Sequence, residues 1–164
     1  MPFTPFHFGP GALVHSAAPK HISFLAFCGA NVLVDVEPLY FMLTHQWPIH
    51  RFFHTYVGAT VAAGIVVALF ALVRRVTPGL LDQLRLRKLG VRAVALGAIL
   101  GTYSHVLLDS LMHADMDPFA PFSDRNPLLG AVFLSTLHGF CLVAGVVGAV
   151  VIGVRYLWNK KHAH

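Results

Sequence analysis

Long apolar segments with few charged positions dominate the chain and predict membrane-spanning helices. Three of them hold about 20 or more mostly apolar residues, which is the length that a helix needs to cross the hydrocarbon core of a bilayer. They run from His54 to Val76, from Val91 to His113 and from Leu128 to Trp158. The third is longer than a bilayer requires, and its many valine and glycine residues are typical of a helix that packs closely in lipid.

The first third of the chain is less regular and leaves the number of membrane helices open. A fourth apolar segment runs from about His21 to Thr44. Before it, residues Thr4–Ala18 predict a short helix, because Thr4 followed by Pro5 is typical of an N-cap and a first helical position. This helix either forms a hairpin with the next segment, which makes five membrane helices, or lies at the interface, which makes four. The prediction is an all-α, polytopic membrane helix bundle with four to five transmembrane helices, in one domain over residues 1–164, with a polar pocket at its outer face.

The composition agrees with a membrane protein. Hydrophobic residues make up 56% of the chain and charged residues only 12%, against roughly 25% charged in soluble domains. The two cysteines, Cys28 and Cys141, both lie within apolar segments. We therefore expect them to be packing residues rather than metal ligands or a disulfide.

Basic residues gather where cytoplasmic loops are expected. They are Arg74, Arg75, Arg85, Arg87, Lys88 and Arg92 in one connection, and Arg155, Lys160 and Lys161 near the C-terminus. The positive-inside rule then places this connection and the C-terminus in the cytoplasm, and connections 45–53 and 114–127 outside. A nucleic-acid surface is the competing interpretation, but membrane spans flank the cluster and no aromatic residues interleave it, so we predict no nucleic-acid partner. The expected location is the bacterial inner membrane.

With this orientation, ionisable side chains from distant parts of the sequence fall at the outer ends of the spans. They are Asp35, Glu37, His50, His54, His105, Asp109 and His113, joined by His7 if the hairpin forms. Ionisable groups at membrane depth are costly and usually mark function. Imidazole and carboxylate groups are also metal ligands. The sequence therefore predicts a metal site facing the periplasm or exterior.

Two histidine motifs have helical spacing. His50 and His54 are four residues apart at the predicted start of a helix. His105 and Asp109 have the same spacing late in another predicted helix, and His113 follows one turn further. Residues at this spacing share one helix face, so each pair can reach one metal or two adjacent metals. The alternatives are histidines at the lipid headgroups for the first pair and a hydrogen bond between helices for the second.

Two acids end the first long apolar segment. Pro38 disfavours helical geometry at Glu37, so we expect a local break that turns Asp35 and Glu37 toward a common site. The alternative is an ordinary helix end in the headgroup region. Asp115 and Asp117 follow in a proline-rich loop, and we interpret them as solvated acids rather than ligands.

Taken in order, these motifs resemble a known family. They are Thr4-Pro5-Phe6-His7, Asp35-Val36-Glu37-Pro38, His50-Arg51-Phe52-Phe53-His54-Thr55, Ser104-His105-Val106-Leu107-Leu108-Asp109-Ser110 and the loop from Pro118 to Ser123. The chain up to about Pro127 resembles the YdjM-type integral-membrane family, whose members are described as metal-dependent hydrolases distantly similar to zinc-dependent phospholipase C and P1 nuclease. The resemblance implies as metal ligands His7, Asp35, His50, His54, His105 and Asp109. Two positions depart from the family pattern, since Glu37 stands where an aspartate is more frequent and Phe53 where a smaller residue is usual.

The predicted function is a membrane-embedded, metal-dependent hydrolase. Zinc is the expected metal, and the expected substrate is a phosphoester of a phospholipid or a lipid-linked molecule, because the pocket would open beside the bilayer. Asp35 or Glu37 could act as the general base or as a ligand, and Arg51 could orient a phosphate.

Two other functions stay open. A metal-ion or proton transporter would also place histidine and aspartate in membrane helices, and it would need polar groups that continue to the inner leaflet. His15 and His138 are the candidates for such groups. A membrane scaffold in which the His–Asp pairs are only structural is the third possibility.

Overall fold

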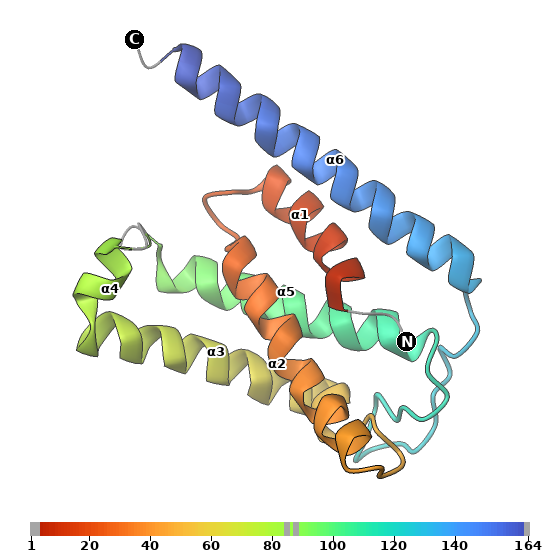
Figure 1. Cartoon of the computed structure of the whole chain (residues 1–164). Helices are drawn as coiled ribbons and strands as arrows, with labels where there is room; N and C mark the ends of the chain where they lie inside the picture. The colour runs from red at the N-terminus through yellow and green to blue at the C-terminus, as the bar shows by residue number, and fades with distance from the viewer. Residues whose placement is uncertain (1–3, 84–85, 87–88, 163–164) are drawn as a thin grey trace.

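The computed structural model describes residues 4–83, 86 and 89–162, and over these ranges its regular elements are helices (Figure 1). The predicted basic residues Arg85, Arg87 and Lys88 lie outside the described residues. The elements in chain order are η1 (Thr4–Phe6), α1 (Phe8–Ala17), α2 (Phe24–Leu43), η2 (Phe52–His54), α3 (Tyr56–Val76), α4 (Pro78–Gln83), α5 (Val91–Ser110) and α6 (Leu134–Lys161). The two labelled η are short 3₁₀ turns.

Four helices are long and apolar enough to cross a membrane, namely α2, α3, α5 and α6. Helix α1 has 10 residues, which is about 15 Å and half of a bilayer core. It forms the hairpin with α2 that the sequence allowed, and it packs against α6 and α2 (Figure 1). The predicted four to five membrane helices are therefore four candidate spans and one half-length helix inside the bundle.

The core of the bundle is formed by α2, α3 and α5. Ala30, Ala63 and Ala98, one from each helix, are buried against one another. Gly101 permits a close approach of α5 to α2, because a Cβ atom there would meet the backbone carbonyl of Phe27. Small residues at such contacts are expected in lipid, where association depends on close packing rather than on the hydrophobic effect.

Helices α1 and α6 form a second pair beside this core. Leu108 of α5 packs against Leu137 and Cys141 of α6, so Cys141 is a packing residue as predicted. Both cysteines are free thiols. A Cβ atom at Gly9 of α1 would meet the backbone of Cys141, so the two helices touch at backbone distance.

Several helix ends differ from the sequence prediction, and three of them have a clear local cause or bear on the site. Helix α3 begins at Tyr56, because the Thr55 side chain accepts the Gly58 N–H at 2.9 Å and caps it. Helix α5 ends at Ser110 instead of His113. Helix α6 begins six residues later than predicted, after a turn in which Gly130 has a φ of 73° that an α-helix cannot adopt.

The expected break at Pro38 is wrong. Helix α2 runs without interruption from Phe24 to Leu43, with Pro38 buried inside it. Proline disfavours the helical conformation of the preceding residue without forbidding it, and packing against neighbouring helices tolerates the missing hydrogen bond. Asp35 and Glu37 therefore project from one continuous helix.

Candidate metal centre

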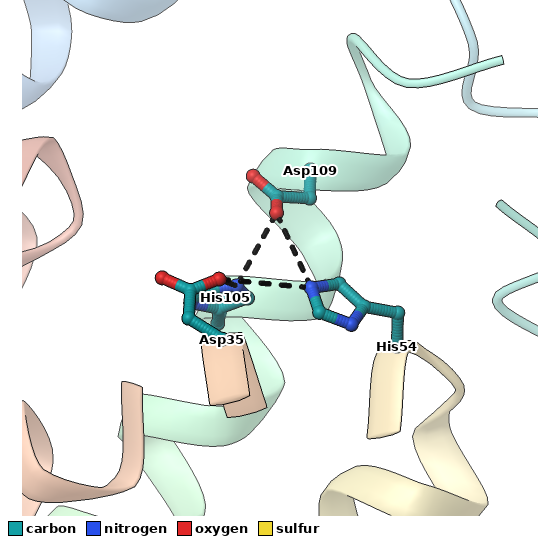
Figure 2. Close-up of side chains that lie close together, drawn as sticks. All are labelled: Asp35, His54, His105 and Asp109. Carbon is teal, nitrogen blue, oxygen red and sulfur yellow. Dashed lines mark ion pairs between the residues drawn. The ribbon is translucent and has the colours of Figure 1, made fainter. Parts of the chain in front are cut away.

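Four ionisable side chains from three segments meet at one end of the bundle (Figure 2). Asp35 comes from α2, His54 from η2, and His105 and Asp109 from α5. Each offers one ligand atom, and these atoms all lie within 4.8 Å of one another. The three residues other than Asp35 are buried. We refer to these four residues as the primary cluster.

The distances within the primary cluster resemble those between ligands of one ion. His105 Nε2 lies 3.2 Å from both Asp35 Oδ1 and Asp109 Oδ2. His54 Nε2 lies 3.6 Å from Asp109 Oδ2 and 3.9 Å from Asp35 Oδ1. Atoms that bind one zinc ion tetrahedrally at about 2.0–2.1 Å are roughly 3.3 Å apart. The donor set and its spacing therefore fit a small divalent cation.

Buried polar atoms without partners support the same conclusion. Among the described residues, none forms a hydrogen bond with His7 Nδ1, His7 Nε2, His54 Nδ1, His54 Nε2, His105 Nε2 or Asp109 Oδ1. Leaving such an atom unpaired costs about 1–3 kcal/mol. Several of these atoms lie close to an opposite partner without being aligned as a hydrogen bond. This arrangement is the one expected of ligands that point at a shared cation.

Two histidines of the primary cluster have their second ring nitrogen beside a side-chain oxygen of α2. His105 Nδ1 lies 2.9 Å from Asn31 Oδ1, and the Asn31 amide nitrogen donates to the Phe27 carbonyl at 2.8 Å. His54 Nδ1 lies 3.8 Å from Glu37 Oε2. Such outer contacts set the tautomer of a metal-binding histidine and orient its ring. In both cases Nε2 is the atom that faces the cluster.

Glu37 also holds the backbone segment that carries His54. Its Oε2 accepts the backbone N–H of Phe53 at 2.9 Å and that of Arg51 at 3.3 Å. On the other side of this segment, a Cβ atom at Gly58 would collide with the carbonyl of Phe52. The position of His54 thus depends on a carboxylate from α2 and on a glycine in the first turn of α3.

A second group adjoins the primary cluster and shares one residue with it. His50, Asp109 and His113 offer ligand atoms that lie within 4.8 Å of one another. The His50 and His113 rings are 4.3 Å apart, and His50 is 4.7 Å from the ring of His54. Asp115 fixes His50, because its Oδ1 lies 2.9 Å from His50 Nδ1 and its Oδ2 accepts the Ile49 N–H at 3.1 Å. We refer to His50, Asp109 and His113 as the secondary group.

Three side chains of the site that lie outside the membrane helices, those of His50, His113 and Asp115, have pKa values below the usual ones. Burial lowers the pKa of His50 below its usual value, and the nearby His54 adds to this although Asp115 acts in the opposite direction. Burial likewise lowers the pKa of His113. Burial alone would raise the pKa of Asp115, but its hydrogen bonds with the His50 ring and backbone outweigh this and keep the pKa below the usual value. At neutral pH both histidines are therefore uncharged, which is the form that binds metals.

His7 lies beside both groups without belonging to either. Its Nε2 is 3.2 Å from Asp109 Oδ1, and its ring meets that of His105 edge-on at 4.4 Å. It is 2% exposed and stands at the N-cap position of α1, so the hairpin brings it to the cluster as the sequence predicted for that arrangement.

Comparison with known proteins identifies the family. The sequence model of the YdjM inner membrane protein family matches residues 5–163, which is nearly the whole chain. The chain belongs to the YdjM inner membrane protein family. Among curated proteins no sequence matches it, and no solved structure matches it. Its location in a membrane is thus supported by both the family and the four candidate spans.

In this YdjM-family chain, the six predicted ligands do come together. The other five predicted ligands each have an atom within 4.8 Å of Asp109. His50 and His54 do not share a helix as predicted, because His50 and Arg51 precede the 3₁₀ turn η2. Arg51 lies at the rim, where its Nε donates to the Pro48 carbonyl at 2.9 Å and its guanidinium carbon is 3.6 Å from the centre of the Phe41 ring.

Sequence reasoning missed two residues of the site. Asn31 belongs to none of the sequence motifs, although a buried amide one turn before Asp35 in an apolar segment is itself unusual. Asp115 was interpreted as a solvated acid, but its side chain is 6% exposed and bonded to His50. His138 lies nearer the beginning of its helix than the sequence predicted, because α6 begins late. Its ring stacks on that of Phe6, with the ring centres 4.9 Å apart.

A cavity of about 410 Å³ lies next to the metal centre. Its ionisable lining residues are His50, Arg51 and Asp117, and its apolar ones include Phe52 and Val57. Because His50 belongs to the secondary group, the cavity adjoins that group. Its volume is within the range of small-molecule sites, which is about 300–1,000 Å³.

Proposed function

We propose that this protein is a membrane-embedded, metal-dependent hydrolase that cleaves a phosphoester of a phospholipid or a lipid-linked molecule. The observation that carries the proposal is the convergence of His54, His105, Asp35 and Asp109, with buried nitrogens that have no hydrogen-bond partner among the described residues. Zinc is the metal that best suits a set of two imidazoles and two carboxylates at these distances. The hydrolytic chemistry is proposed from the resemblance of the sequence motifs to metal-dependent hydrolases.

The residues of the centre divide the work of hydrolysis. His54, His105, Asp35 and Asp109 would hold a divalent metal, and its Lewis acidity would favour attack by water on a phosphoester near neutral pH. Asp35 is the most accessible member, with a side chain 28% exposed, and the carboxylate oxygen that does not face His105 and His54 would accept the proton of the attacking water. The water oxygen bonds to phosphorus, the bond to the leaving oxygen breaks, and that oxygen takes a proton from solvent. Arg51 binds a non-bridging phosphate oxygen from the cavity rim.

The cavity supports a lipid substrate. His50 and Arg51 lie on its wall close to the metal centre, while Phe52 and Val57 are exposed apolar residues. Val57 belongs to the first turn of the membrane helix α3. An amphiphile can therefore place its phosphate beside His50 and its acyl part along the apolar wall without leaving the bilayer.

The centre faces the exterior in this proposal. Arg74, Arg75 and Arg92 lie at the opposite ends of α3 and α5 from His54 and Asp109. The positive-inside rule then puts the metal centre outside and the C-terminus in the cytoplasm. Fusion of alkaline phosphatase, which is active only outside, and of a fluorescent protein to the C-terminus tests this, and an active phosphatase fusion would contradict it.

The packing beside the centre argues against a transporter. On its inner side lie the buried alanines Ala30, Ala63 and Ala98, with Val66 and Val67 packed on them. Thr102, one turn before His105 in α5, and Ser16, near the end of α1, bond to backbone carbonyls of their own helices. Among the described residues, the buried ionisable side chains thus gather at one end, as an active site requires.

Activity on defined phosphodiesters tests the proposal. Detergent-purified protein loaded with zinc should hydrolyse bis(4-nitrophenyl) phosphate or phosphatidylglycerol in mixed micelles. His54→Ala and His105→Ala should reduce the rate at least about 100-fold, because each removes a ligand. His21→Ala, a change at an exposed histidine between α1 and α2, is the matched control and should keep full activity. Zinc-loaded wild-type protein that cleaves neither substrate would refute the proposal.

A further inference from the structure

Asp109 belongs to two ligand groups, and its two carboxylate oxygens have different neighbours. Oδ2 lies 3.2 Å from His105 Nε2 and 3.6 Å from His54 Nε2, within the primary cluster. Oδ1 lies 3.2 Å from His7 Nε2. The same carboxylate is close to His50 and His113, since the three ligand atoms lie within 4.8 Å of one another. A carboxylate placed in this way can bind one cation through each oxygen.

We propose that the secondary group of His50, Asp109 and His113 is a second cation site, bridged through Asp109 to the primary cluster, so that the chain holds a two-metal centre. This inference rests on the proposed function and deepens it. Two adjacent cations stabilise both the attacking and the leaving oxygens of an in-line displacement at phosphorus. The centre would therefore suit a phosphoester better than a carboxylic ester or a peptide.

The orientation of His50 supports a ligand role over simple ring packing. Its Nδ1 is occupied by Asp115 Oδ1 at 2.9 Å, so Nε2 is the nitrogen left for a cation. Asp115 Oδ2 also accepts the backbone N–H groups of Ile49 and His50, which holds the segment and the ring as one unit. Two imidazoles that only packed together would not require a buried carboxylate to set the tautomer of one of them.

The segment that carries His113 is fixed as well. The His113 N–H donates to the Asp109 carbonyl at 2.8 Å, which prolongs the helical turn beyond α5. The Asn126 amide nitrogen donates to the Ser110 carbonyl at 2.8 Å and to the His113 carbonyl at 3.3 Å. Met116 is buried between α3 and α5 just beyond this turn. The third ligand is thus positioned by contacts that do not involve the cation.

The secondary group also lies closer to the substrate cavity, because His50 lines that cavity. A cation there would be adjacent to a phosphate held by Arg51, which also lines it. The primary cluster contains the more enclosed residues, since His54 and His105 are 1% and 0% exposed. We therefore expect the secondary site to exchange its cation faster and to bind it more weakly.

Metal stoichiometry tests the proposal without reference to activity. Full-length protein in detergent is stripped with a chelator, titrated with Zn²⁺, passed through a desalting column and analysed for zinc. Wild-type protein should retain about two ions per chain, His113→Gln about one, and Asp109→Asn less than one. His21→Ala is the control and should retain about two. Titration with Co²⁺ should show a second change in visible absorption after the first equivalent in wild-type protein and in His21→Ala, but not in His113→Gln or Asp109→Asn.

Each other outcome has a definite meaning. If wild-type protein binds one ion, the second site is refuted while the primary cluster and the proposed function survive. If it binds none, both proposals fail together. If His113→Gln still binds two, His113 is not a ligand and the site as described is overturned. Should His113→Gln not yield folded protein, His50→Gln removes a ligand from a different segment, and the Co²⁺ titration of wild-type protein decides the number of sites by itself.

Discussion

Glu37 and His54 come from different segments, yet the carboxylate of one lies behind the ring of the other. Glu37 Oε2 is 3.8 Å from His54 Nδ1, on the side of the ring away from Asp109 and Asp35, and it also accepts the Phe53 N–H at 2.9 Å. Glu37 is therefore placed to orient a ligand and to hold the segment that carries it. Glu37 is less suited to be the general base, because its Oε2 already accepts the backbone N–H groups of Phe53 and Arg51.

Removal of the Glu37 carboxylate should weaken metal binding without removing a ligand. We expect Glu37→Ala to lower zinc affinity about 10–100-fold, the usual effect of losing a partner behind a metal-binding histidine. Glu37→Gln keeps an oxygen for the Phe53 N–H and should lose less. Competition with a chromophoric chelator measures both. Asp124→Ala, in an exposed loop, is the control, and an affinity of Glu37→Ala equal to that of this control would contradict the assigned role.

Metal removal should destabilise the folded protein. The primary cluster exists only in the folded chain, so zinc at 100 times its dissociation constant adds about 2.7 kcal/mol to stability. For a chain of this size that corresponds to a Tm shift of roughly 5–10 °C. Thermal unfolding in detergent with and without chelator measures it. Asp109→Asn should show almost no shift. A scaffold in which His105 and Asp109 are only structural predicts instead that the chelator has no effect on wild-type protein.

Gly58 should be far less tolerant of substitution than Gly64 in the same helix. A Cβ atom at Gly58 would collide with the Phe52 carbonyl, whereas one at Gly64 would meet nothing within 4 Å. Gly58→Ala must displace η2 and with it His54, so we expect lower Tm and a loss of zinc affinity of about 10-fold or more. Gly64→Ala should leave both unchanged or raise the Tm slightly. Equal behaviour of the two variants would show that the position of η2 does not depend on this contact.

Acidification should destabilise the metal-free protein through His50 and His113. Their pKa values are lowered in the folded chain, so below about pH 6.5, the usual pKa of histidine, the unfolded chain binds more protons than the folded one. Stability therefore falls as the pH drops through this value. The groups that face the two rings are His54, Asp109 and Asp115.

The comparison is between wild-type protein and the double variant His50→Gln/His113→Gln, both treated with chelator. We expect the Tm of the double variant to vary less between about pH 7.5 and pH 5. Asp115 contributes in a separate window, because its lowered pKa adds stability above about pH 4 that is lost only at more acidic pH. A double variant whose Tm falls as steeply as that of wild-type protein would show that these two histidines do not carry the effect.

The sequence alone determined that this is a membrane protein and that His105 and Asp109 lie side by side. Apolar length is a local property, so the four candidate spans could be recognised without tertiary information. The spacing of His105 and Asp109 places both on one face of any helix that contains them, and the structure shows the resulting contact at 3.2 Å. The positions of His54 and Asp35 near the same helix ends followed from topology, because alternate ends of successive antiparallel spans meet on one side.

Only the tertiary structure showed which residues orient the histidines of the site and how the ionisable residues form the primary cluster and the secondary group. Asn31 and Asp115 lie 74 and 65 residues from the histidines that they orient, and no local pattern indicates a contact over such a distance. The sequence placed His50 and His54 on one face of an α-helix. In the structure His50 precedes the 3₁₀ turn η2 that contains His54, and Gly58 and Glu37 pack around this turn. Hydrophobic length specifies which segments enter the membrane, but side-chain geometry at their ends depends on how closely the backbones approach, and that is a property of the assembled helices.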